Sequence, residues 1–287
     1  MGGSRMRIEL TDEQIAFYRE NGFLVIENFL DADELQLWRE VTEEAVAQRL
    51  EAAGRAGFSA DRPETLVNQA DPDAYYAQVF VQCVRLADTH EGMAKLMLDE
   101  RLGKIAGTLA GVDGIRIWHD QALIKPPYGN PTAWHLDVPY WSFFSRDAIS
   151  LWVALDDATL ANGCLWYLPG THKLATEKNV GIGHNMGDLF KIYPEWKQIE
   201  AVPAACPAGS AVFHNGLTAH AAGPNMTPRP RRAMTCAYMP DGCRFNGQRN
   251  VLPPDYFASL KVGDLLNNDR QNPLIWSAKR QTTAGVS

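Results

Sequence analysis

The sequence predicts a mainly β fold, a sandwich or jelly roll, with α-helices gathered at the N-terminal end. After Gly114 the apolar residues fall in short runs, and turns rich in glycine, proline and asparagine separate these runs. That pattern is typical of antiparallel sandwiches and barrels. Before Gly114 the apolar residues recur at helical spacing instead. We therefore expect the helices to pack outside one sheet.

The helical part is expected over about residues 10–112. Thr11 and Gln14 match a capping box, which opens a short helix, and the Asn-Gly pair at 21–22 ends that helix. Residues 23–26 are apolar throughout and predict a buried strand directly after it.

A second helix is expected to begin at Asp31, with Glu34 three residues later. Its core-facing side chains recur every three or four positions, at Leu35, Trp38, Val41, Ala45 and Val46. Residues 55–72 are polar and predict a loop. Two further helices are expected over residues 75–86 and 93–109.

The β part is expected from about residue 113 to residue 240. Its predicted strands cover residues 115–124, the segment that carries His135 and Asp137, and residues 149–155, 164–168, 210–214 and 232–239. Asn162-Gly163 is a hairpin-turn signal, so we expect the strands on its two sides to pair. Residues 179–200 break the pattern, and a long insertion of this kind is typical of a lid or binding loop.

We expect one domain over residues 6–287, because the sequence shows no internal repeat and no linker. The 287 residues are long for an average domain, but jelly rolls and barrels commonly reach roughly 200–250 residues as one unit. Residues 241–287 contain many Asn, Asp, Gly and Pro residues, and we expect them to wrap the surface.

Composition and charge argue against several classes of protein. The formal net charge of −7 argues against nucleic acid as a partner, since phosphate binding needs a basic surface. We expect no membrane span and no secretion signal, because neither sequence pattern is present. The five cysteines are scattered without C-x-x-C spacing, which favours reduced thiols in a cytoplasmic protein. The sequence leaves the oligomeric state open.

His135, Asp137 and His220 form a candidate metal site. Residues i and i+2 of a strand face the same side, so His135 and Asp137 are expected to project together. A histidine from a distant strand completes a set of two imidazoles and one carboxylate. Such a set binds Fe(II) and leaves positions open for a co-substrate and O2. An H-x-D tripeptide alone is a weak signal, and its simpler interpretation is a strand-end histidine beside a solvated aspartate.

Several ordered motifs accompany these residues. They are Gln121-x-x-x-Lys125, Trp134-His135-x-Asp137, Trp152-x-Ala154-Leu155-Asp156-Asp157, Asn162-Gly163-Cys164-Leu165, Pro169-Gly170-Thr171-His172, His220-Ala221-Ala222-Gly223-Pro224-Asn225 and finally Arg231. Together they resemble the phytanoyl-CoA dioxygenase family of Fe(II)- and 2-oxoglutarate-dependent oxygenases, over roughly residues 10–240. The resemblance implies a double-stranded β-helix, which is a jelly roll, with N-terminal helices.

The resemblance also implies roles for individual residues. By it, His135, Asp137 and His220 are the iron ligands, and Arg231 binds the C5 carboxylate of 2-oxoglutarate. A planar guanidinium suits that carboxylate because it makes a bidentate, charge-assisted contact. Related halogenases have a small residue where Asp137 stands, so the resemblance implies oxidation rather than halogenation.

The sequence departs from the family at Ala222, where several relatives carry a serine that helps to hold the co-substrate. The candidates for helping Arg231 are Gln121, Lys125 and Trp152. The first two equally fit the simpler role of strand side chains bonded to the backbone. Arg229 and Arg232 rival Arg231, but Arg232 is expected to face the other way and Arg229 lies between prolines in a predicted turn.

The substrate pocket is expected beyond the ligand strand, and its candidate residues are Tyr140, Trp141, Phe143 and His214. The aromatic side chains suit an apolar part of a substrate, although an aromatic core explains them equally well. His214 is a candidate for supporting a metal ligand rather than for being one. His119 and His172 are expected to be structural.

The sequence thus predicts an enzyme, an Fe(II)- and 2-oxoglutarate-dependent dioxygenase that uses O2 to hydroxylate an unactivated C–H bond of a small molecule. Secondary metabolism is one setting for such a reaction. Two alternatives stay open. One is a cupin-like isomerase or hydrolase that uses the same triad without 2-oxoglutarate and has no need of Arg231. The other is a non-catalytic jelly-roll binding protein.

Overall fold

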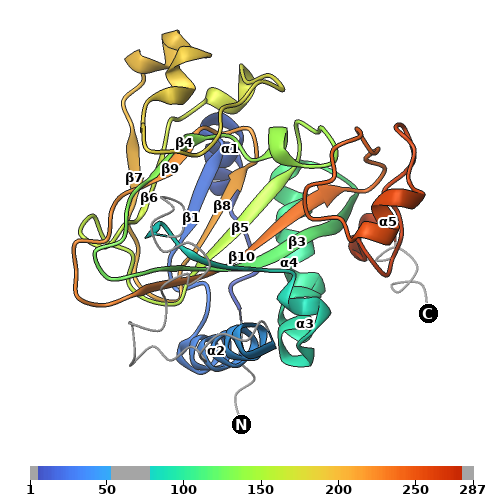
Figure 1. Ribbon diagram of the computed structural model, residues 1–287, viewed down its shortest axis with the longest axis horizontal. Helices are drawn as coiled ribbons and strands as arrows, with labels where there is room; N and C mark the ends of the chain where they lie inside the picture. Colours follow the sequence, from blue (N-terminus) through green and yellow to red (C-terminus); the bar gives the residue numbers. More distant parts are fainter. Residues whose placement is uncertain (1–5, 53–77, 280–287) are drawn as a thin grey trace.

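The computed structural model describes residues 6–52 and 78–279, and it contains two antiparallel β-sheets with helices on the outside (Figure 1). The predicted fold class is confirmed. The fold is a jelly roll, or double-stranded β-helix, with its N-terminal helices packed on one sheet. The loop predicted over residues 55–72 lies outside the described residues.

The two sheets differ in size. The larger sheet has the order β1 (Phe23–Ile26), β8 (Ala211–Asn215), β5 (Ile149–Ala154), β10 (Arg231–Pro240), β3 (Gly114–Lys125) and β11 (Leu274–Ser277), and β2 (Val81–Val84) also pairs with β3. The smaller sheet has the order β4 (Thr132–His135), β9 (His220–Ala222), β6 (Leu165–Tyr167) and β7 (Val202–Ala204). Apolar side chains from both sheets, such as Val212 and Leu165, form one cluster between them.

The helices are α1 (Asp12–Asn21), α2 (Ala32–Ala52), α3 (Glu91–Met97), α4 (Glu100–Ala110) and α5 (Pro254–Ser259). Short 3-10 helices are η3 (Leu86–Asp88), η4 (Val138–Tyr140), η5 (Thr171–Lys173), η6 (Asp188–Lys191) and η7 (Pro194–Gln198). The first four α-helices pack apolar side chains, such as Trp38 and Leu102, against apolar side chains of the larger sheet, such as Ile117 of β3. This cluster is the main core, and it lies on the face of the sheet opposite the site described below.

The first two helices begin as their sequences predict. The Thr11 hydroxyl accepts from the Gln14 amide at 3.2 Å, and the Gln14 side chain accepts from the Thr11 amide at 3.0 Å. Asp31 and Glu34 make the same reciprocal pair at the start of α2. Gly22 ends α1 with φ at +83°, a backbone conformation that glycine adopts without strain.

The helix predicted over residues 75–86 is wrong within the described chain, because residues 81–84 form the strand β2. Its residues pair with Gln121 to Ile124 of β3, which satisfies their backbone groups. Tertiary pairing thus overrides the local pattern. The helix predicted over residues 93–109 is two helices, because the Asp99 carboxylate accepts from the Arg101 amide and starts α4 there.

The hairpin predicted around Asn162-Gly163 is also wrong. The strand before the turn, β5, pairs with β8 and β10, whereas the strand after it, β6, belongs to the other sheet and pairs with β7 and β9. The turn itself forms, with Gly163 at φ +90°. A tight turn fixes the reversal of the chain but not the sheet that the next strand joins.

The C-terminal segment does more than wrap the surface. Its strand β11 extends the larger sheet beside β3. The guanidinium of Arg116, on β3, donates to Asp241 and Asp269 at 2.5 and 2.6 Å and to the Asn272 carbonyl at 2.9 Å. These contacts hold the segment so that Asn250 and Val251 reach the cavity described below.

We predict that Gly107→Ala destabilises the protein, although alanine is the better helix former by about 1 kcal/mol. A Cβ at this position of α4 would lie 2.3 Å from the Trp276 ring of β11. Overpacking of this kind costs about 1–3 kcal/mol, measurable as the free energy of unfolding by denaturant titration. In a Trp276→Ala background the same substitution should be neutral or stabilising. Equal effects in both backgrounds would contradict this packing.

Candidate functional site

A cavity of about 420 Å³ lies between the two sheets. Its described lining includes five strands of the larger sheet, β2, β3, β5, β8 and β10, and three strands of the smaller one, β4, β6 and β9. Ile182, from the segment 179–200, and Asn250 and Val251, from the C-terminal segment, complete the wall.

Two imidazoles face each other in this cavity. His135 ends β4 and His220 begins β9, and antiparallel pairing makes them register partners with ring centroids 4.1 Å apart. The Nδ1 atoms contact the backbone carbonyls of Ala133 at 2.8 Å and Thr218 at 3.0 Å. If each Nδ1 carries the proton and donates it to its carbonyl, both Nε2 atoms keep a free lone pair, as a metal ligand must.

The Asp137 carboxylate meets these two Nε2 atoms. Its Oδ1 lies 3.6 Å from Nε2 of His135 and 3.6 Å from Nε2 of His220. The ligand atoms of the three residues all lie within 4.8 Å of one another, close enough to share one ion. The expectation that Asp137 continues the strand is wrong, because β4 ends at His135 and Asp137 has a helical backbone with φ −82° and ψ −52°. The three side chains nevertheless converge.

The other oxygen of Asp137 is held by the larger sheet. Oδ2 accepts from the Ser150 hydroxyl at 3.1 Å and lies 3.2 Å from Nε2 of His214. Nδ1 of His214 in turn lies 2.9 Å from the Tyr167 hydroxyl. His214 therefore contacts the carboxylate from behind, outside the group of three donors.

The electrostatics of the three residues suit a cation. Burial, together with the nearby His220 imidazole, lowers the pKa of His135 to about 4. Burial likewise lowers the pKa of His220 to about 4. Burial by itself would raise the pKa of the Asp137 carboxyl, but the His220, His214 and His135 imidazoles hold it well below its usual range. At neutral pH the site is thus two neutral imidazoles and one anion, the donor set that Fe(II) takes.

Arg231 is a fully buried cation with open hydrogen-bond donors. Its Nη2 donates to the Gly163 carbonyl at 3.0 Å, but Nε and Nη1 have no partner among the described residues. Its guanidinium lies 5.1 Å from the Trp152 ring centroid, and Trp152 also lines the cavity. Burial lowers the pKa of Arg231 to about 10, so the group stays charged. A carboxylate is the ligand that these open donors fit.

Lys125 lies beside Arg231 as its register partner on β3, and it is also fully buried. Its Nζ donates to the Asn130 carbonyl at 2.6 Å and lies 4.5 Å from the Phe80 ring centroid. Burial, with the charge of Arg231, lowers the pKa of Lys125 to about 6. Arg232 faces the other way, as predicted, and pairs with Asp156 at 2.7 Å.

Thr132 is a candidate that the sequence analysis missed. It lies opposite Ala222, as its register partner in the smaller sheet, and both line the cavity. Its buried hydroxyl has no partner among the described residues. The hydroxyl that Ala222 lacks is therefore present on the neighbouring strand. Only the pairing of β4 with β9 reveals this, so no local motif could have found it.

The remaining candidates divide between the cavity and the core. Gln121 lines the cavity and accepts from the Gln82 side chain at 2.5 Å. Tyr140 and Trp141 also line it. Phe143 is absent from the described lining and is fully buried against Trp118 and Trp141.

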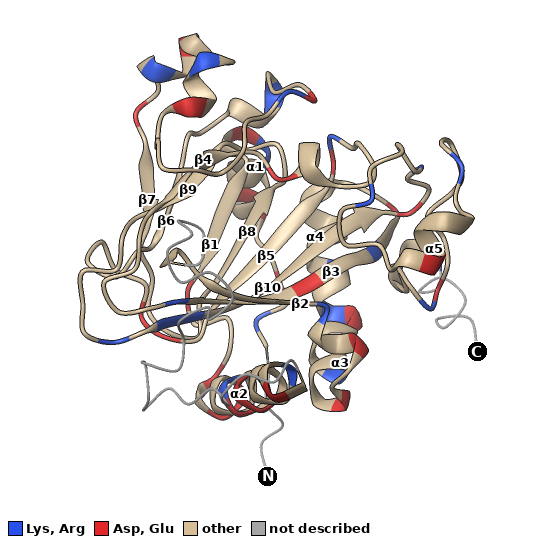
Figure 2. Cartoon of the chain, viewed as in Figure 1, with Lys and Arg blue, Asp and Glu red and all other residues tan. Residues whose placement is uncertain are grey.

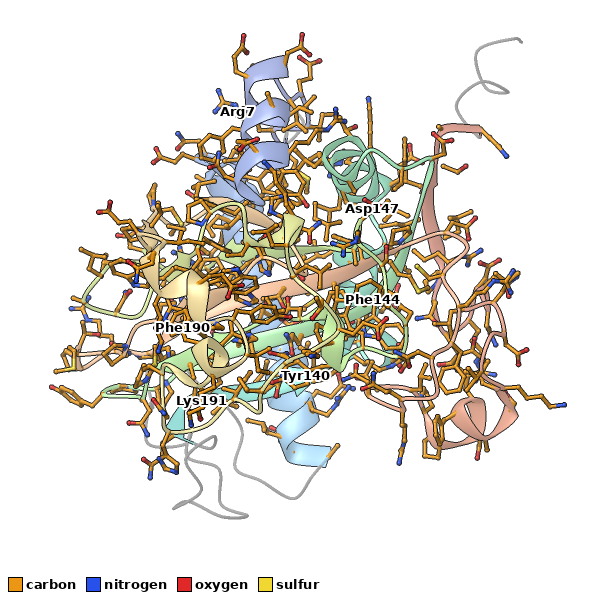
Figure 3. The ribbon with its side chains drawn as sticks, turned by 90° about the horizontal axis from the view of Figure 1, so that it is seen from above. Arg7, Tyr140, Phe144, Asp147, Phe190 and Lys191 are labelled. Atoms are coloured by element: carbon orange, nitrogen blue, oxygen red, sulfur yellow. The ribbon has the colours of Figure 1, made fainter. Side chains whose placement is uncertain are left out.

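The segment 179–200 is bonded to the ligand strand. The Asn179 side chain donates to the carbonyl of Leu136 at 2.6 Å and accepts from its amide at 3.4 Å. Leu136 is the residue between His135 and Asp137. The Tyr140 hydroxyl donates to the Val180 carbonyl, and Figure 3 shows Tyr140 between Phe190 of this segment and the C-terminal chain. The segment therefore contributes Ile182 to the cavity wall and contacts the backbone of the site.

Residues 18–233 match the sequence profile of the phytanoyl-CoA dioxygenase (PhyH) family. The chain belongs to this family. A methylphosphonate hydroxylase of Gimesia maris is 28% identical over 242 residues, which cover 81% of this chain and 82% of that protein. The peroxisomal phytanoyl-CoA dioxygenase of Mus musculus is 29% identical over 244 residues, covering 82% of this chain and 70% of that protein.

A solved structure agrees with this assignment. The non-heme α-ketoglutarate-dependent carbocyclase SnoK from nogalamycin biosynthesis superposes with a TM-score of 0.73 and 26% identity, over 95% of this chain and 99% of that chain. The chain is thus a 2-oxoglutarate-dependent dioxygenase that uses iron, and the two alternative functions are set aside. The open donors of Arg231 fit a carboxylate of 2-oxoglutarate, and the three converging side chains fit iron.

We predict that Thr132→Val weakens 2-oxoglutarate binding about 10- to 100-fold, the effect of losing one hydrogen bond to a charged group. The dissociation constant is measured by calorimetry on Fe(II)-loaded protein without O2. Thr132→Ser keeps the hydroxyl and should bind like the wild type. Equal affinity of the Val and wild-type proteins would remove Thr132 from the co-substrate site.

Proposed function

We propose that this dioxygenase hydroxylates an unactivated C–H bond of an uncharged small molecule of the kind made in secondary metabolism. The observation that carries the proposal is the chemistry of the cavity wall. The described residues that line it include no Lys or Arg, and Asp137 is their one acidic member. The other lining residues are neutral polar side chains, such as Gln121, Thr235 and Asn250, and aromatic or aliphatic ones, such as Trp141, Ile182 and Val251.

The composition of this wall argues against two kinds of substrate that the relatives' names suggest, methylphosphonate and CoA esters. Methylphosphonate and CoA esters carry negatively charged phosphoryl groups, which proteins hold with Lys, Arg or helix N-termini. Figure 2 shows Lys and Arg interspersed with Asp and Glu on α2, α3 and the loops, while the strands are mostly uncharged. SnoK comes from nogalamycin biosynthesis, which supports a substrate from secondary metabolism.

The proposed roles follow from the geometry. His135, Asp137 and His220 hold the iron, and Ser150 and His214 fix the second carboxylate oxygen so that Oδ1 points to the metal. When bound, iron and 2-oxoglutarate supply the oxidant that is made from O2.

Arg231 lies behind the cavity-lining Trp152 and anchors the distal carboxylate of 2-oxoglutarate, with Lys125 beside it and the open Thr132 hydroxyl as a further donor. Trp152 packs against the guanidinium, and Gln121 lies in the same wall. The segment 179–200 acts as a lid that keeps water from the reacting groups, and Asn179 couples its position to the ligand strand.

The direct test is succinate release by purified, Fe(II)-loaded protein given 2-oxoglutarate, O2 and a panel of small molecules. Asp137→Ala should abolish release, because the iron loses its one anionic ligand. Asp157→Ala removes an exposed carboxylate outside the cavity lining and is the control. Release at the wild-type rate from Asp137→Ala would refute the assignment.

We predict that Arg231→Met raises the dissociation constant of 2-oxoglutarate about 10- to 100-fold, since a buried charged hydrogen bond is lost. The adjacent Arg232→Met removes a guanidinium that faces away and pairs with Asp156, so it should leave this constant near the wild-type value. Calorimetry without O2 compares the three proteins. Equal constants for both variants would mean that the acidic co-substrate binds elsewhere.

We predict that 2-oxoglutarate binding at pH 7.5 takes up close to one proton. Lys125, with its pKa lowered to about 6, is mostly neutral in the free protein, and a nearby dianion favours its charged form. The uptake is measured from binding enthalpies in buffers of different ionisation enthalpy. Lys125→Met should lose it. An uptake that is absent from the wild type, or unchanged in the variant, would contradict this role of Lys125.

A further inference from the structure

His119 stands out among the polar groups that face the cavity. It lies on β3, lines the cavity and is 8% exposed. Its Nδ1 is enclosed without a hydrogen-bond partner among the described residues. The sequence predicts a structural role for His119, but its Nδ1 makes no hydrogen bond that would explain such a role.

The sheet register places His119 level with the metal site. His119 pairs with Ala237 of β10, Ala237 pairs with Ser150 of β5, and Ser150 pairs with His214 of β8. Ser150 and His214 are the two residues that contact the Asp137 carboxylate. His119 is two strands from Ser150, and neighbouring strands are about 4.8 Å apart, so roughly 10 Å separates them.

The residue between them leaves room for a ligand. Ala237 also lines the cavity, and its methyl group is the smallest side chain of this row. On the other side the Trp141 ring meets the His119 ring edge to face, with centroids 6.5 Å apart. A flat molecule lying over Ala237 would thus have an aromatic wall at one end and the metal site at the other.

The protonation of His119 limits its partner. Burial lowers the pKa of His119 to about 4, so the ring is neutral at neutral pH, with one donor and one acceptor nitrogen. An anion would favour the charged ring, which burial disfavours. A neutral group that donates or accepts, such as a hydroxyl or a ketone, matches the ring.

We propose that His119 orients the primary substrate by a hydrogen bond to a neutral hydroxyl or carbonyl group on an otherwise apolar ring system. This inference rests on the proposed function and narrows its substrate class. The bond fixes one end of the molecule and directs a C–H bond roughly 10 Å away towards the metal site, a distance set by two strand spacings. His119 is thereby a specificity-determining residue, and it takes no part in holding iron.

The test compares two ring probes that differ in one group, 1-naphthol and 1-methylnaphthalene. Their dissociation constants are measured by equilibrium dialysis against protein loaded with Fe(II) and 2-oxoglutarate, without O2. The readout is the ratio of the two constants, which cancels changes in general affinity. His119→Leu should reduce the preference for the hydroxylated probe about five- to tenfold, the worth of a hydrogen bond left unmade in a buried site.

Two further variants make the result decisive. His119→Gln keeps a donor and an acceptor and should restore most of the wild-type ratio. Thr235→Val removes a cavity-lining hydroxyl that already donates to the Gln121 carbonyl at 3.2 Å, so it should leave the ratio unchanged. Loss of binding of both probes by His119→Leu contradicts the proposal, because 1-methylnaphthalene has no group that bonds to His119.

An unchanged ratio in His119→Leu overturns the inference, as does a wild-type protein that does not bind 1-naphthol, or loss of the preference in both His119 variants. Failure of the proposed function is a separate outcome, because it appears as the absence of Fe(II)- and 2-oxoglutarate-dependent succinate release from the wild type. The binding ratio needs no turnover.

Discussion

The site depends on one carboxylate, that of Asp137, which faces two neutral imidazoles with one oxygen and the larger sheet with the other. A buried carboxylate is costly unless each oxygen has partners, and here the two oxygens draw theirs from different sheets. The pairing of β4 with β9 sets His135 opposite His220. The spacing of the two sheets then decides whether Ser150 reaches the same aspartate. A jelly roll fixes that spacing at about 10 Å, so the convergence is a property of the whole fold.

A second feature of the site, its buried basic side chains, lowers the stability of the ligand-free protein. Arg231 and Lys125 bury two basic side chains side by side, and no described acidic group is hydrogen-bonded to either of them. Such groups cost free energy in the empty protein, and a dianionic ligand would recover much of that cost on binding. The Thr132 hydroxyl and Nδ1 of His119 are likewise buried without a hydrogen-bond partner among the described residues. Polar groups without protein partners therefore mark the proposed binding positions along the cavity: Thr132 and Arg231 for the co-substrate, and His119 for the substrate.

Local chemistry made part of this structure predictable. The capping pairs at Thr11 and Asp31, the glycine after α1 and the long alternating strands β3 and β10 are encoded within a few residues, and the structure has them where the sequence indicates. The ordered motifs predicted the family and brought the three donor residues to attention. Features that depend on which strands meet were not predictable. Strand β2 looked helical, the turn at Gly163 joined different sheets, and Thr132 gained its interest only from lying opposite Ala222. The surroundings of His119 and the hydrogen-bond partners of Asn179 are likewise set by distant segments, which no local pattern reports.

In the proposed site, His135, Asp137 and His220 hold one iron to which 2-oxoglutarate also binds. The decisive measurement is an anaerobic titration of the protein with Fe(II) in the presence of 2-oxoglutarate, followed by the visible charge-transfer absorption of an iron–2-oxoglutarate complex. We expect a band that saturates at one iron per chain in the wild type and is lost in His220→Ala. A wild type without the band, or a His220→Ala protein with the same band and stoichiometry, would contradict it.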